Sequence, residues 1–115
     1  MINYGNKNFI GICNSIDYGV GHETIFYYSQ DYNIVSAKYS GGNIIMGMLI
    51  GLVNKDGSIK SCYQHIDNYQ IIRTGECKHK LEILEDGRYR LYESWQWTNG
   101  DLSTGNSIVE EVVFN

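Results

Sequence analysis

Residues 88–98 read Arg-Tyr-Arg-Leu-Tyr-Glu-Ser-Trp-Gln-Trp-Thr, and the character of their side chains alternates with a period of two. Because successive side chains of a β-strand point to opposite faces, this stretch predicts a strand. The more polar face, expected outside, carries Arg88, Arg90, Tyr92, Ser94 and Gln96. The other face is apolar apart from one carboxylate and is expected inside: Tyr89, Leu91, Glu93, Trp95 and Trp97.

Turn-forming residues separate similar stretches along the rest of the chain. The clearest turns are residues 31–33, 41–43, 54–57, 85–87 and 99–101. They delimit about eight expected strands, at residues 8–14, 23–30, 34–40, 44–53, 58–66, 71–84, 88–98 and 107–114. A bend or bulge is expected near Gly75, because a glycine inside a strand often marks one. A short helical turn would fit residues 16–22 or 101–106.

Strands joined by short turns form an antiparallel meander. Closing a meander into a barrel removes the exposed edge strands that promote aggregation. The sequence therefore predicts an all-β fold, an antiparallel up-and-down barrel of about eight strands, lipocalin-like, as a single domain over residues 1–115. An open sandwich of two sheets is the alternative.

Composition and charge narrow the function classes. The formal net charge of −4 disfavours binding to nucleic acid or to an anionic membrane surface. The N-terminus shows no leader, and no apolar run reaches the roughly 18 residues of a membrane span, so we expect no membrane partner and a cytoplasmic location. The three cysteines, Cys13, Cys62 and Cys77, form no C-x-x-C motif, and their odd number indicates reduced thiols.

Three further strands contribute expected inward faces. In residues 58–66, Tyr63 and His65 point inward, because Lys60 and Gln64 suit solvent better. In residues 44–53 the inward set is Ile45, Gly47, Leu49, Gly51 and Val53. In residues 71–84 it is Ile71, Arg73, Gly75 and Cys77, which would bring Arg73 near Glu93.

Glu93 is the most informative residue of this interior. A carboxylate on an apolar face must be paired, hydrogen-bonded or protonated, because burying it alone costs several kcal/mol. We expect His65 to be its partner. Near the C-terminus, one acid of the Glu110-Glu111 pair should face out, and the other should cap a barrel end or pair with an arginine.

Aromatic walls with a few convergent polar groups are typical of a small-molecule site. The residues expected to line such a pocket are Tyr63, His65, Arg73, Glu93, Trp95 and Trp97. The alternative is that these side chains fill the barrel and that the polar ones only satisfy each other.

Motifs spread over most of the chain carry a family resemblance. They comprise Tyr39-Ser40-Gly41-Gly42, Leu49-Ile50-Gly51, Tyr63-Gln64-His65, Thr74-Gly75-Glu76-Cys77, Glu82, Asp86-Gly87-Arg88 and the run from Arg90 to Thr98. In them the chain resembles a family of short bacterial proteins that genome annotation commonly labels N-acetylglutamate synthase. The resemblance implies a lipocalin-like barrel.

The activity in that label does not fit the residues. Acetyltransferases that use acetyl-CoA hold its pyrophosphate at a glycine-rich turn followed by a helix N-terminus. Here the segment from Tyr39 to Asn43 is followed by the strand-like run 44–53, which supplies no such helix. We therefore expect the label to be a transferred error.

The leading function hypothesis is a barrel that binds a small hydrophobic or aromatic ligand. An enzyme using Glu93 and His65 as acid and base is one alternative, and a nucleophilic Cys77 beside His65 is a weaker one. A self-associating protein is another, with Met46, Met48 or Tyr92 exposed at a homodimer interface. No cofactor and no metal site are expected, because His22, His65 and His79 lack diagnostic spacing and His79 should lie near a rim.

Overall fold

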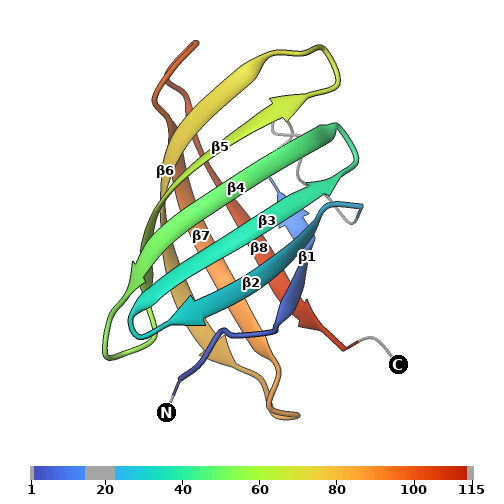
Figure 1. Cartoon of the computed structure of the whole chain (residues 1–115). Helices are drawn as coiled ribbons and strands as arrows, with labels where there is room; N and C mark the ends of the chain where they lie inside the picture. The colour runs from blue at the N-terminus through green and yellow to red at the C-terminus, as the bar shows by residue number, and fades with distance from the viewer. Residues whose placement is uncertain (1, 15–22, 114–115) are drawn as a thin grey trace.

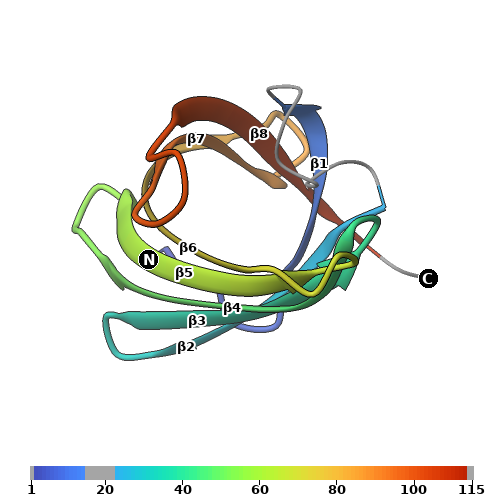
Figure 2. The ribbon, with the colours of Figure 1, turned by 90° about the horizontal axis from the view of Figure 1, so that it is seen from above.

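Eight antiparallel strands close into a barrel in the computed structural model, which describes residues 2–14 and 23–113 (Figure 1). Each strand pairs with the next along the chain, and β8 pairs with β1, as the view down the barrel shows (Figure 2). The strands are β1 (Asn8–Asn14), β2 (Ile25–Asp31), β3 (Ile34–Gly41), β4 (Ile44–Val53), β5 (Ile59–Asp67), β6 (Ile72–Ile83), β7 (Tyr89–Trp97) and β8 (Thr104–Val112).

The predicted up-and-down barrel is therefore confirmed, and the open sandwich is wrong, because the β1–β8 pairing leaves no free edge. Strand β8 begins at Thr104, so residues 101–106 form no helical turn. The other predicted helical turn, at residues 16–22, lies outside the described residues. In the described ranges no helix has the length and apolar character needed to cross a membrane.

Two hairpins, β4–β5 and β6–β7, have similar turns, each with a glycine of positive φ. After β4, the N–H of Asn54 donates to Ser58 O at 2.8 Å and Gly57 takes a φ of 86°. After β6, the N–H of Leu84 donates to Arg88 O at 2.8 Å and Gly87 takes a φ of 89°. Glycine reaches this left-handed region without steric cost, which fixes both turns and with them the register of the strands they join.

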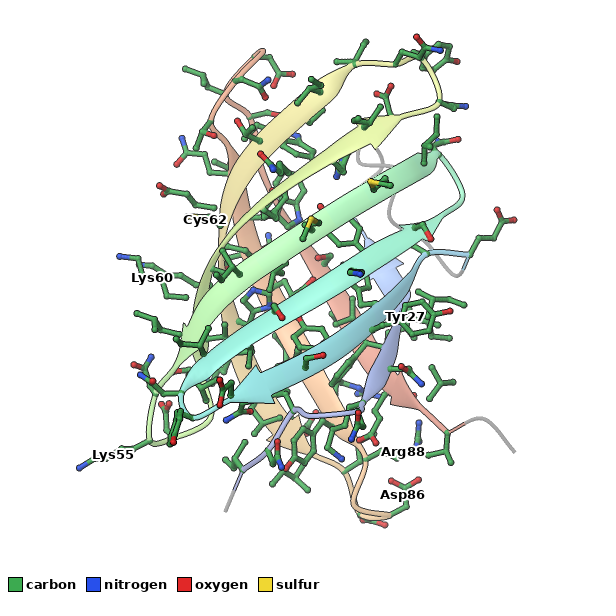
Figure 3. The ribbon with its side chains drawn as sticks, in the orientation of Figure 1. Tyr27, Lys55, Lys60, Cys62, Asp86 and Arg88 are labelled. Atoms are coloured by element: carbon green, nitrogen blue, oxygen red, sulfur yellow. The ribbon has the colours of Figure 1, made fainter. Side chains whose placement is uncertain are left out.

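The predicted faces of β5 and β7 are confirmed. All five residues assigned to the inner face of β7 are buried, and Ser61 and His65 of β5 are buried as well. Cys62 and Lys60 of β5 project outward (Figure 3).

On β4 the prediction is right from Gly47 to Val53 and wrong at Ile45, which is exposed while Ile44 is buried. A β-bulge between Ile44 and Met46 causes this exchange, since one extra residue reverses the alternation.

Strand β6 differs from its prediction at two positions. Ile71 precedes the strand and is exposed. Gly75 is in regular register with Tyr63 on β5 and with Trp97 on β7, so the predicted bend or bulge there is wrong.

One end of the barrel is closed by the segment that precedes β1. The Tyr4 side chain is fully buried, packs against the rings of Phe9, Tyr28 and Tyr89, and donates its hydroxyl hydrogen to Gly57 O. The rings form one hydrophobic cluster that fills this half of the interior. The remaining free space lies in the other half.

Candidate ligand-binding cavity

A cavity of about 50 Å³ lies between the Tyr4 cluster and the barrel end formed by the β5–β6 and β7–β8 turns. One water needs roughly 10–15 Å³ measured in this way, so there is room for more than one. The lining residues are Phe26, Tyr39, Leu49, Tyr63, His65, Cys77, His79, Glu93, Trp95, Trp97 and Ser107. The structure thus brings together five of the six residues predicted to line a pocket, and Arg73 is the exception.

Three inward-facing glycines make room for the large rings of the wall. Gly47 is in register with Tyr39, Gly75 with Tyr63, and Gly105 with Trp95. A Cβ added at any of the three glycines would overlap the ring opposite. The rings of these lining residues therefore lie against a neighbouring strand, which leaves the centre of the barrel open.

Trp97 is the centre of an aromatic group at the end of the cavity away from Tyr4. Its ring makes edge contacts with Tyr63 and His65, each with centroids 5.4 Å apart. The Arg73 guanidinium lies over the Trp97 ring at 4.2 Å and pairs with Asp101 at 3.6 Å. Arg73 therefore covers Trp97 rather than reaching Glu93. The prediction that Arg73 lies near Glu93 is wrong, because β6 places Arg73 opposite His65.

His65 is buried but is not the partner of Glu93. Its Nδ1 lies 3.0 Å from the Tyr39 hydroxyl, and its ring makes an edge contact with Tyr39. The pKa of His65 is lowered to about 4, mainly because the ring is buried; the Asp67 charge opposes this shift and the weaker effect of the Arg73 charge adds to it. The imidazole is therefore neutral near pH 7 and offers the cavity a neutral hydrogen-bonding edge.

Glu93 instead contacts His79, and the prediction that His79 lies near a rim is wrong, because its side chain is only 2% exposed. Glu93 Oε2 lies 2.6 Å from His79 Nδ1, and Ser107 Oγ donates to Glu93 Oε1 at 3.0 Å. On the other side of the ring, His79 Nε2 lies 2.7 Å from Ser61 Oγ. Four strands thus contribute to one polar chain across the barrel interior.

The polar chain brings the charged or polar groups of His79 and Glu93 into direct contact, and both residues line the cavity. Ser61 lies outside the lining, so its hydroxyl orients the imidazole rather than meeting a ligand. Burial, together with the charge of Glu93, raises the pKa of the Cys77 thiol. A protonated thiol is a poor nucleophile, which counts against the weaker alternative of a nucleophilic Cys77.

The two acids near the C-terminus lie as predicted, one on the outside of the barrel and the other at a barrel end. Glu110 accepts from Arg88 at 2.9 Å and from Arg90 at 2.6 Å on the outside of the barrel. Glu111 is buried at the end closed by Tyr4, where it accepts from the backbone N–H of Tyr89 at 2.9 Å and pairs with Lys7 at 3.2 Å.

Comparison with protein families now adds to this geometry. A family model described as "Avidin-like protein" matches residues 2–112. The chain belongs to the avidin-like family. Searches of curated proteins and of solved structures found no match.

Membership in the avidin-like family agrees with the barrel-type fold that the sequence resemblance implied. It gives no support to the N-acetylglutamate synthase label that accompanied that resemblance. In an avidin-like barrel of eight strands, the interior is wide enough to be filled by side chains or to hold one small ligand.

Proposed function

We propose that this avidin-like protein binds a small organic molecule, using the cavity between Trp97 and Glu93. One observation carries the proposal: unfilled space is kept open where aromatic rings and polar groups meet. Buried, mostly apolar cavities with a few directed polar groups are the usual form of small-molecule sites. The family match supports the same function.

The lining suggests the chemistry of the ligand. Trp95 and Trp97, with centroids 5.8 Å apart and planes inclined by 48°, offer aromatic surface to a flat or aliphatic group. Ser107, Glu93 and the neutral His65 offer hydrogen bonds to a polar group. Because the free volume is small, a larger ligand would insert one end, and the rest would lie toward Tyr63 and Arg73.

Tryptophan fluorescence tests this proposal, because Trp95 and Trp97 are the two tryptophans of the chain and both line the cavity. The protein is titrated with biotin, with fatty acids and with a panel of aromatic and heterocyclic metabolites. We expect saturable quenching by at least one compound, weakened about tenfold or more in Ser107→Ala and in Trp97→Phe. Tyr92→Phe, on the outer face of β7, is the matched control and should bind normally.

A flat fluorescence response across the panel, with calorimetry also showing no heat of binding, would count against a ligand site. Equal binding by Ser107→Ala, Trp97→Phe and the wild type would place the ligand elsewhere on the protein.

We also propose that the protein self-associates through the outer face of β4. Four apolar side chains form a row there, Met46, Met48, Ile50 and Leu52, and each is more than half exposed. A contiguous apolar face of this kind often marks an interface between proteins. Its test is given in the Discussion.

A further inference from the structure

Three potential metal ligands converge on one wall of the barrel. Cys77 and His79 are two residues apart on β6 and therefore share its inner face, and Glu93 lies directly opposite His79 on β7. All three side chains are buried, and one ligand atom from each lies within 4.8 Å of the other two. All three also line the cavity.

The position of the imidazole is a second, independent observation. His79 Nδ1 is buried 2.6 Å from Glu93 Oε2, yet among the described residues it makes no hydrogen bond of normal geometry. Its other nitrogen, Nε2, is occupied by Ser61 Oγ. The nitrogen beside Glu93 is thus the one that Ser61 leaves available to a metal ion.

A serine contacts the histidine and another contacts the carboxylate, each at the atom that would not bind the metal. Metal-binding histidines generally donate their second ring N–H to an oxygen, and metal-binding carboxylates are themselves hydrogen-bonded. Ser61 Oγ lies 2.7 Å from His79 Nε2, and Ser107 Oγ lies 3.0 Å from the second oxygen of Glu93. These supports hold Nδ1 and Oε2 next to each other.

We propose that Cys77 Sγ, His79 Nδ1 and Glu93 Oε2 bind one divalent zinc-type ion. Sulfur, imidazole nitrogen and carboxylate oxygen form the mixed ligand set that Zn²⁺ accepts and that Mg²⁺ and Ca²⁺ do not favour. Three protein ligands leave a fourth position, which here faces the cavity. On binding, the thiol of Cys77 loses its proton to solvent and the sulfur–metal bond replaces the S–H bond.

The geometry requires a small opening of the cluster. Bonds of about 2.0–2.2 Å at a tetrahedral angle place nitrogen and oxygen roughly 3.3–3.6 Å apart. Nδ1 and Oε2 are 2.6 Å apart, so their side chains must separate slightly, and the adjoining cavity gives them space.

Equilibrium dialysis against Zn²⁺ with elemental analysis tests the proposal, and Co²⁺ replaces Zn²⁺ for absorption spectroscopy. The wild type should retain one ion per chain and show a thiolate-to-Co²⁺ charge-transfer band. Cys77→Ala should lose that band and bind at least tenfold more weakly, and His79→Gln should also bind at least tenfold more weakly. Three matched controls should retain Zn²⁺ as the wild type does. They are Cys62→Ala on the outside of β5, His65→Gln in the same cavity, and His22→Gln.

No retained ion in the wild type, or equal retention by Cys77→Ala, would overturn the site. Circular dichroism checks the fold of each variant, and Cys77→Ala decides the question if His79→Gln does not fold. The experiment uses no organic ligand, so its result is independent of the small-molecule proposal, and either one can fail alone.

Discussion

At the scale of single residues, the neutral imidazole of His65 links stability to pH. Its pKa in the folded protein is about 4, below the usual value of 6.5, mainly because it is buried. Protonation therefore favours the unfolded chain. The stabilising contribution is complete above pH 6.5 and is lost as the pH falls from 6.5 toward 4.

We therefore expect the melting temperature of the wild type to decline between pH 6.5 and pH 5, before most carboxylates are protonated. His65→Gln removes the titrating group and should show a clearly shallower decline over this window. Thermal denaturation followed by circular dichroism at closely spaced pH values measures both profiles. Parallel profiles would show that His65 does not carry this dependence.

The Tyr28 hydroxyl gives a second prediction for a single residue. It is buried and has no hydrogen-bond partner among the described residues, and burial raises its pKa well above the usual value, so it remains a protonated donor. An unsatisfied buried polar group costs about 1–3 kcal/mol. Tyr28→Phe should therefore leave stability unchanged or raise it by about 1 kcal/mol in urea denaturation. Tyr27→Phe, at the half-exposed neighbour, is the control, and a marked loss in Tyr28→Phe alone would refute the interpretation.

At the scale of strands, the pairing of glycine with an aromatic ring decides where the interior is empty. Gly47→Ala places a methyl group against the ring of Tyr39 and should push that ring toward the cavity. We expect a loss of about 1–3 kcal/mol, typical of overpacking. In a Tyr39→Leu background the same change should cost much less, which a double-mutant cycle of urea denaturation curves measures. Additive effects would mean that the ring is not the obstacle.

Strand positions and inner faces could be predicted from the sequence, because alternation and turn residues are local signals. Contacts between strands were predicted less well: the expected pairing of Glu93 with His65 rested on chemical plausibility alone. Counting outward from the turn at Asp86 would have placed His79 opposite Glu93, and counting from the β5–β6 turn would have placed Arg73 opposite His65. The bulge at Ile44 had no comparable signal, because it depends on how three strands fit together.

At the scale of the whole molecule, the apolar row on β4 predicts association. Met48 and Ile50 are at its centre, with 51% and 61% of their surface exposed. We expect a dimer at micromolar concentration, measured by light scattering coupled to size exclusion, and a monomer for the double variant Met48→Lys/Ile50→Lys. Tyr92→Lys, on the outer face of β7, is the control. A wild type that stays monomeric up to high concentration would contradict the prediction.

The closure of one end of the barrel has a consequence for joining the protein to a tether or a solid support. Residues 2–7 lie at this end, and Asn8 pairs with Val112, so both described ends of the chain lie toward this end of the barrel, on different sides of it (Figures 1 and 2). Trp97 and Arg73 lie at the opposite end. A tether, reporter domain or solid support joined next to residue 2 or residue 113 would therefore lie toward the sealed end and leave the other end facing the medium, the orientation that an immobilised receptor requires.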